Sequence, residues 1–168
     1  MTRGEPKQSI LRRYLEDAIA AERNFETQLR VMAGQGDNMG ARLLFAQHAE
    51  ETKSQHARLR KRLEALGGSP SGLKTALAHL LHFIPKTAQI GHDPSEVVTQ
   101  NLIIGYSVEN AEIAMYEALA SMAAAAGDLQ TEQLAREIQA EERRAANMIW
   151  QLISQCAQEC YGKIAEAA

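Results

Sequence analysis

Apolar residues recur every three or four positions along four long stretches of the chain, which predicts four amphipathic helices. The first two helices are expected at about residues 9–33 and 41–66. The last two are expected at about residues 95–127 and 129–161. Strands would show long stretches of alternating apolar and polar residues, and the sequence has none of these. The pattern therefore predicts an all-α protein.

The breaks between these helices differ in length. A Gly-rich segment at 34–40 separates the first two helices, and Gly127 separates the last two. Between the second and third helices the chain has Gly and Pro at 67–70, a short apolar helix expected at 73–83, and a connector at 85–94. A link of this length can cross the whole bundle, so that the second and third helices run parallel. This is the single long crossover of ferritin-like four-helix bundles, here with a short additional helix in the connector.

Length and composition limit the possible functions. A chain of 168 residues is expected to form one domain, with the bundle at about 9–161 and polar tails at both ends. The net charge is −3 and basic residues are interleaved with acidic ones, so nucleic-acid binding is not expected. There is no apolar run that could span a bilayer and no apolar signal segment at the start. We therefore expect no membrane association and a cytoplasmic location.

Each expected helix has a carboxylate at a position where the pattern calls for an apolar residue. In the first helix, Glu22 lies in the middle of the face formed by the apolar residues. A lone carboxylate buried there would be strongly destabilising or would take up a proton. Four converging carboxylates are expected if cations lie between them, and carboxylates bind iron and manganese well. The four acids are Glu22, Glu51, Glu109 and either Glu141 or Glu142, because a small error in the helix boundary exchanges the last two.

Other polar side chains share these helix faces. His48 and Gln55 lie on the face of Glu51, and Glu112 lies beside Glu109 as either a ligand or a surface partner of a basic residue. We predict two iron or manganese ions in the bundle. The predicted metal ligands are Glu22, His48, Glu51, Glu109, Glu112 and Glu142. Possible supporting residues are Gln55, Tyr106, Tyr116 and Glu141, with packing as the simpler role for the two tyrosines.

Four short motifs fall on these faces. They are Ala21-Glu22, His48-x-x-Glu51-Thr52-x-x-Gln55, Glu109-x-x-Glu112-Ile113-Ala114-x-Tyr116 and Glu141-Glu142. Together they resemble the bacterial ferritin-like stress-protein family typified by YciE and YciF, over about residues 15–152. The second motif is the most specific of the four. The resemblance implies a ferritin-like fold, a di-metal centre and dimerisation, and it implies no established substrate.

The chain departs from the pattern of that family at three positions. Asn110 and Ala111 replace a usual His-Tyr pair, and Ala146 replaces a usual Asp. Two functions therefore stay open. The chain is either a di-metal carboxylate protein that handles oxidants or metal during stress, or a metal-free structural or protein-interaction bundle. In the second case the acids would be protonated, solvated or paired with arginines such as Arg143 or Arg144. Whether the protein is an enzyme stays open as well.

A homodimer is the expected assembly. It is implied by the resemblance, and apolar residues in the connector are left over once the bundle core is filled. These residues are Leu77, Leu80, Leu81 and Phe83.

Overall fold

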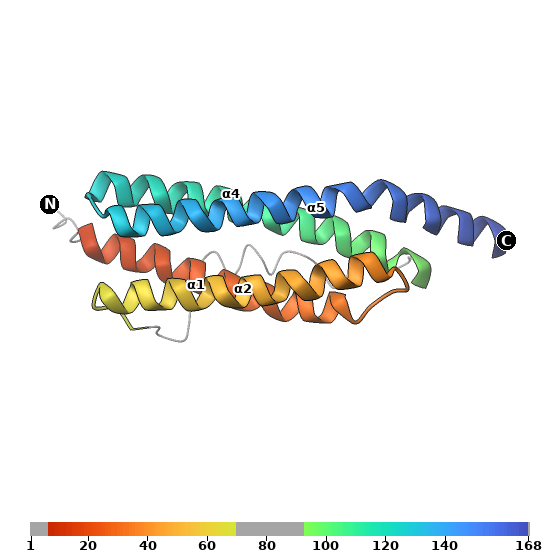
Figure 1. The fold of residues 1–168 in the computed structure, drawn as a ribbon, viewed down its shortest axis with the longest axis horizontal. Coiled ribbons are helices and arrows are strands. Elements are labelled where there is room, and N and C mark those ends of the chain that lie inside the picture. Colours follow the sequence, from red (N-terminus) through yellow and green to blue (C-terminus); the bar gives the residue numbers. More distant parts are fainter. Residues whose placement is uncertain (1–6, 70–92, 168) are drawn as a thin grey trace, which may run out of the picture.

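The structure is a computed structural model that describes residues 7–69 and 93–167. Its elements are α1 (Lys7–Ala33), α2 (Met39–Ala65), the short 3-10 helix η2 (Pro94–Glu96), α4 (Val97–Ala126) and α5 (Leu129–Ala167). The four long helices form an elongated bundle (Figure 1). The predicted all-α four-helix bundle is therefore confirmed. The short helix expected at 73–83 and its apolar residues lie outside the described residues.

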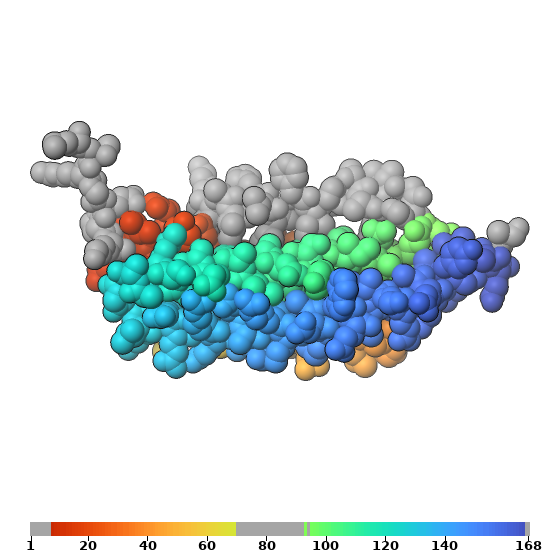
Figure 2. All heavy atoms as spheres, turned by 90° about the horizontal axis from the view of Figure 1, so that it is seen from above, coloured from red at the N-terminus to blue at the C-terminus, as the bar shows by residue number. Residues whose placement is uncertain are grey.

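The helices are arranged as two antiparallel hairpins. α1 pairs with α2, α4 pairs with α5, and the hairpins meet through α1 against α4 and α2 against α5. Figure 1 shows that α2 ends at one end of the bundle and that α4 begins at the other. α2 and α4 therefore run in the same direction, as the predicted long crossover requires. In the second view, α4 and α5 lie side by side along one face (Figure 2).

Local signals explain where the helices begin and end. The side chain of Asn38 accepts a hydrogen bond from the amide of Ala41 at 3.0 Å and caps the start of α2. Gly127, with φ of 78°, ends α4 in the left-handed conformation that glycine adopts easily. Asp128 then accepts a hydrogen bond from the amide of Thr131 at 3.1 Å and caps α5. The α4–α5 loop is therefore short, because Gly127 ends one helix and Asp128 caps the next.

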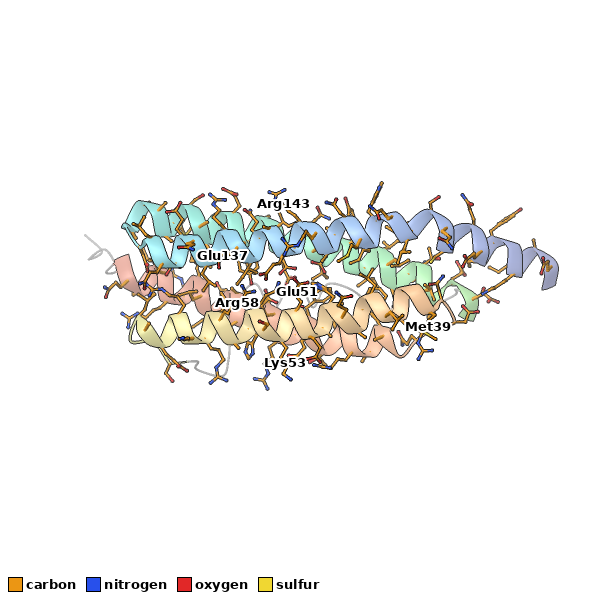
Figure 3. All side chains as sticks on the ribbon, viewed as in Figure 1. Met39, Glu51, Lys53, Arg58, Glu137 and Arg143 are labelled. Atoms are coloured by element: carbon orange, nitrogen blue, oxygen red, sulfur yellow. The ribbon has the colours of Figure 1, made fainter. Side chains whose placement is uncertain are left out.

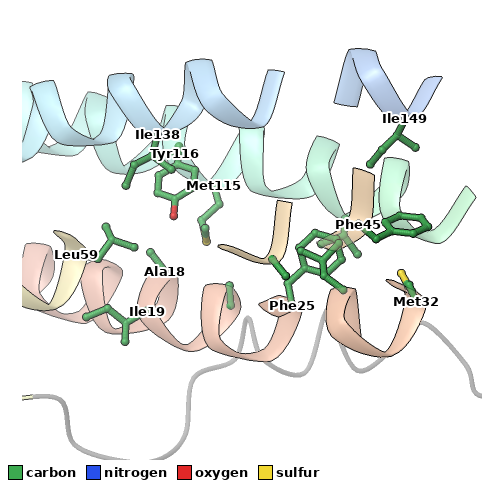
Figure 4. Packing of buried hydrophobic residues seen from close by; sticks show 14 of the residues in the cluster. Ala18, Ile19, Phe25, Met32, Phe45, Leu59, Met115, Tyr116, Ile138 and Ile149 are labelled. Carbon is green, nitrogen blue, oxygen red and sulfur yellow. The ribbon is translucent and has the colours of Figure 1, made fainter. Parts of the chain in front are cut away.

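The core is a row of aliphatic and aromatic side chains along the bundle axis (Figure 4). Phe25, Phe45 and Ile149 pack in one part of this row, and Leu59 and Ile138 pack in another. Among the described helices, none is both long enough and apolar enough to cross a membrane. The apolar core is interrupted near its middle, where polar side chains from all four long helices point inward.

Candidate metal centre

Five polar side chains form a cluster in the middle of the core, which we call the buried centre. Glu22 comes from α1, Glu109 and Glu112 come from α4, and Glu142 comes from α5, and each is at most 2% exposed. α2 contributes His48, which is also 2% exposed. Every long helix therefore supplies at least one ionisable group to the same place. Because Glu112 is fully buried, it is not a surface partner of a basic residue.

His48 connects two of these acids. Its Nε2 lies 2.7 Å from Oε1 of Glu109 and 3.8 Å from Oε2 of Glu142. One ligand atom from each of the three residues lies within 4.8 Å of the other two. Ligand atoms around one small divalent cation lie about 2.0–2.1 Å from the metal, so atoms with this spacing could share an ion after small side-chain movements.

Two neutral side chains donate hydrogen bonds to acids of the buried centre. The hydroxyl of Tyr116 donates a hydrogen bond to Oε1 of Glu22, and Figure 4 shows that this hydroxyl points from α4 toward α1. The amide of Gln55 donates to Oε1 of Glu142 at 2.5 Å and to Oε2 of Glu141 at 3.1 Å. Tyr116 and Gln55 are themselves buried. Their hydrogen bonds therefore fix the orientation of one acid on α1 and one on α5.

Each carboxylate in the buried centre still has an unsatisfied oxygen. Oε2 of Glu22, Oε2 of Glu109, Oε1 of Glu112 and Oε2 of Glu142 have no hydrogen-bond partner, and neither does Nδ1 of His48. An unsatisfied buried polar group costs about 1–3 kcal/mol, and native proteins rarely contain several together. Divalent cations would pair with these oxygens, so the donor set of the buried centre fits metal ions.

Three acids of the buried centre have a pKa well above the usual range of a carboxyl group. Burial raises the pKa of Glu22 to about 8, although the hydrogen bond from Tyr116 opposes this shift. Burial and then the charge of Glu22 raise the pKa of Glu112 well above its usual range. The same two causes raise the pKa of Glu142. Without cations, the centre would therefore retain protons at neutral pH.

The pKa of His48 is also raised, but by neighbouring carboxylates and not by burial. Burial lowers its pKa, but the interactions with Glu109 and Glu51 outweigh this effect and raise the pKa to about 9. A metal ion at His48 would have to displace this proton, because a histidine ligand is neutral.

Glu51 lies at the margin of the buried centre and not inside it. Its side chain is 34% exposed, with Oε2 at 3.5 Å from Nδ1 of His48 and Oε1 at 3.9 Å from Arg144. The fully buried position on this part of α2 belongs to Thr52, whose hydroxyl has no hydrogen-bond partner. Thr52 was not among the predicted site residues, although it lies four residues after His48 on the same helix face.

The two neighbouring acids of α5 differ in their exposure to solvent. Glu142 points into the buried centre, whereas Glu141 is 17% exposed and accepts a hydrogen bond from Arg58. Arg58 therefore neutralises an acid outside the centre. In the described part of the chain, the ion pairs of Glu109 and Glu142 are with His48.

The remaining residues from the sequence analysis lie outside the centre. Tyr106 is half-buried and packs against Trp150, with ring centroids 5.1 Å apart. Asn110 is exposed and donates a hydrogen bond to the carbonyl of Tyr106 at 2.7 Å. Ala111 is half-buried and Ala146 is buried. The departure at Asn110 therefore removes no inward-pointing group from this chain.

A family model described as "Domain of unknown function (DUF892)" matches residues 7–161. The chain belongs to this family. The resemblance inferred from the four motifs is thereby confirmed.

Solved structures similar to this DUF892 member cover nearly the whole chain. A protein of Xanthomonas campestris pv. campestris is 26% identical, with a TM-score of 0.78 over 95% of this chain and 98% of that one. The E. coli stress protein YciF is 22% identical, with a TM-score of 0.81 over 92% of this chain and 99% of that one. A ferritin-like, diiron-carboxylate protein of Bacillus anthracis is 14% identical, with a TM-score of 0.71 over 89% and 99%. The last two matches support the ferritin-like fold alone.

Proposed function

We propose that this protein binds two iron or manganese ions in the buried centre. Four carboxylates can balance the charge of two divalent cations, and the observation that supports this best is the unsatisfied oxygen on each of them. Protons could neutralise the acids as well, but they would leave several buried acceptors without a donor. Carboxylate and imidazole ligands suit iron and manganese.

The residues divide naturally between two ions. Glu109, Glu142 and His48 would hold one ion after small side-chain movements, since their ligand atoms lie within 4.8 Å of one another. Glu22 and Glu112 would supply oxygens to the second ion, each from a fully buried position. Tyr116 would hold Glu22 in place and Gln55 would hold Glu142, so that neither acid has to reorganise much when a cation arrives.

The proposed role is the handling of oxidants or metal during stress. Iron or manganese bound by carboxylates can exchange electrons with dioxygen or peroxide. The protein would contribute a dry environment, because the ligands are at most 2% exposed, and a set of acids that release protons as cations bind. The alternative is a metal-free structural or protein-interaction bundle, in which Glu22, Glu112 and Glu142 stay protonated.

Metal content separates these two functions. The protein is purified without chelator and its metals are measured after incubation with Fe(II) under anaerobic conditions or with Mn(II). We expect about two ions per chain. Glu142→Gln should weaken metal binding about tenfold or more, since even the loss of a residue that only supports a ligand has an effect of this size. The matched control is Glu141→Gln, which removes the same charge from the neighbouring residue outside the centre. If neither metal binds or raises the melting temperature, the metal-free bundle is the better description.

We also propose a homodimer. The connector residues behind this prediction lie outside the described part of the chain, but Trp150 is 60% exposed beside Tyr106, and Ile103 nearby on α4 is 46% exposed. Such exposed apolar side chains are suited to contact with another protein surface. Light scattering at micromolar concentration tests the proposal, and a monomer at that concentration would contradict it.

A further inference from the structure

Most of the buried centre is closed to solvent. Glu22, Glu109, Glu112 and Glu142 are each at most 2% exposed, so a cation from solution cannot meet any of them first. Glu51 is different, because a third of its side chain is exposed while one carboxylate oxygen faces His48. Figure 3 shows Glu51 and Arg58 on the side of α2 that faces α5, whereas Lys53 lies on the opposite side of α2.

A continuous set of ligand atoms leads inward from Glu51. Its Oε2 lies 3.5 Å from Nδ1 of His48, a buried nitrogen without a hydrogen-bond partner. The other ring nitrogen of His48 lies 2.7 Å from Glu109. The imidazole therefore faces the half-exposed acid with one nitrogen and the buried acids with the other. A cation held by Glu51 would be next to the buried centre.

Two arginines lie near Glu51, and they differ in how tightly their side chains are bound. Arg58 is hydrogen-bonded to Glu141, which in turn accepts from the buried amide of Gln55. Arg144 lies 3.9 Å from Glu51 and is 64% exposed, so this pair is long and solvated. Exposed ion pairs of this kind contribute little to stability, and their side chains move easily. Arg144 can therefore leave Glu51 at little cost, whereas Arg58 stays in place.

We propose that divalent cations enter the buried centre between α2 and α5, where Glu51 receives the cation, His48 links it to the buried acids and Arg144 moves aside. This inference rests on the proposed function, since it describes how the proposed centre fills. In this scheme, Glu51 controls the rate of filling and the buried acids control the final metal content. Arg144 opposes entry, because its positive charge must leave before a cation can bind Glu51.

The test measures rate and final metal content on the same samples. Metal-free protein is mixed rapidly with Mn(II), uptake is followed with a fluorescent Mn(II) indicator, and bound Mn(II) is measured after equilibration. Glu51→Gln should slow uptake about tenfold, because a steering charge is lost, and Arg144→Gln should accelerate uptake about threefold. Both differences should shrink at about 0.5 M salt, because salt screens exposed charges.

Two neighbouring substitutions provide matched controls. Glu50→Gln and Arg143→Gln change the net charge by the same amounts one residue away, and both side chains are exposed. Their uptake rates should stay within about twofold of the unmutated protein. Equal rates for Glu51→Gln and Glu50→Gln would overturn the inference. A final Mn(II) content reduced in Glu51→Gln would also overturn it, since Glu51 would then be a resident ligand. If the unmutated protein takes up no Mn(II), the proposed function fails together with the entry route.

Discussion

The hydroxyl of Tyr116 on α4 donates a hydrogen bond to Oε1 of Glu22 on α1. Both side chains are completely buried, and Oε2 of Glu22 has no hydrogen-bond partner. Burial raises the pKa of Tyr116 well above its usual range, so the phenol keeps its proton and remains a donor. The bond joins the two helix hairpins inside the buried centre.

Removal of this hydroxyl should destabilise the metal-free protein. Tyr116→Phe keeps the ring but leaves Glu22 without its hydrogen-bond donor. We expect the free energy of unfolding to fall by about 1–3 kcal/mol. Added Mn(II) should recover part of this loss if a cation pairs with the freed oxygen. Urea denaturation followed by circular dichroism, with and without Mn(II), measures both effects.

Tyr106→Phe is the matched control for this substitution. Tyr106 is on the same helix, but it packs against Trp150 outside the buried centre. Its substitution should change the free energy of unfolding by less than about 0.5 kcal/mol, as is usual for partly exposed positions. Equal losses of unfolding free energy in the two variants would show that the hydrogen bond to Glu22 does not stabilise the protein.

The four helices were predictable because apolar residues recur with the 3.6-residue period along most of their length, although the middle of the buried face of α2 is polar. Glu22 and Glu109 were predictable for the same reason, since each lies in the middle of an apolar face. Glu51 was harder to place. A broad core-facing stripe on α2 accommodates either Glu51 or Thr52, and the partner helices bury Thr52. One helix alone does not contain that information.

The extents of the helices were also only partly predictable. α5 continues past Tyr161 to Ala167. Near this end, Lys163 forms an ion pair with Asp37 at 2.6 Å, and Glu159 accepts a hydrogen bond from Asn38 at 3.2 Å. These contacts join the last helix to the first hairpin loop, more than a hundred residues earlier in the chain. Periodicity within the last helix does not reveal them.

Gly36 should tolerate alanine less well than Gly127 does. Both glycines have positive φ, 71° and 78°, so alanine is strained at each and should cost about 1–2 kcal/mol. At Gly36 an added Cβ would lie 2.1 Å from Cγ2 of Val98, whereas at Gly127 it would meet nothing within 4 Å. Gly36→Ala should therefore lose a further 1–3 kcal/mol, approximately the cost of overpacking. Chemical denaturation compares the two variants, and equal losses would contradict close packing of this loop against α4.

Arg62 should be sensitive to a conservative substitution. Its guanidinium donates to both carboxylate oxygens of Asp128 at 2.7 Å and to the hydroxyl of Thr131 at 2.8 Å, which ties the end of α2 to the start of α5. Lysine cannot make this forked contact. Arg62→Lys should lower the free energy of unfolding by about 1–2 kcal/mol. Arg60→Lys, at an exposed pair of 4.0 Å with Glu64, should have almost no effect.

The stability of the metal-free protein should fall as the pH rises from about 5 to about 8. Burial raises the pKa of Glu22 from 4.5 to about 8 in the folded protein. Between these values the folded chain binds more protons than the unfolded chain, so the stabilisation is complete below the lower value and is lost as the pH approaches the upper one. His48, whose pKa rises from 6.5 to about 9 against the effect of its burial, contributes with the same sign. Urea denaturation across this range, without metal, measures the slope.

Mn(II) should reverse this dependence. Cations need deprotonated carboxylates and a neutral imidazole, so the stabilisation by added Mn(II) should grow with pH over the same range. Glu22→Gln should reduce the slope of the metal-free protein, because glutamine does not titrate, and should make it more stable than the unmutated chain near pH 8; His48 still contributes the remaining slope. Stability that is constant or rises between about pH 5 and about pH 8 without metal would contradict the burial of protonated acids in the centre. In that case the free energy of unfolding would not show opposite pH dependences with and without Mn(II). The acids of the buried centre would then have to be in contact with water.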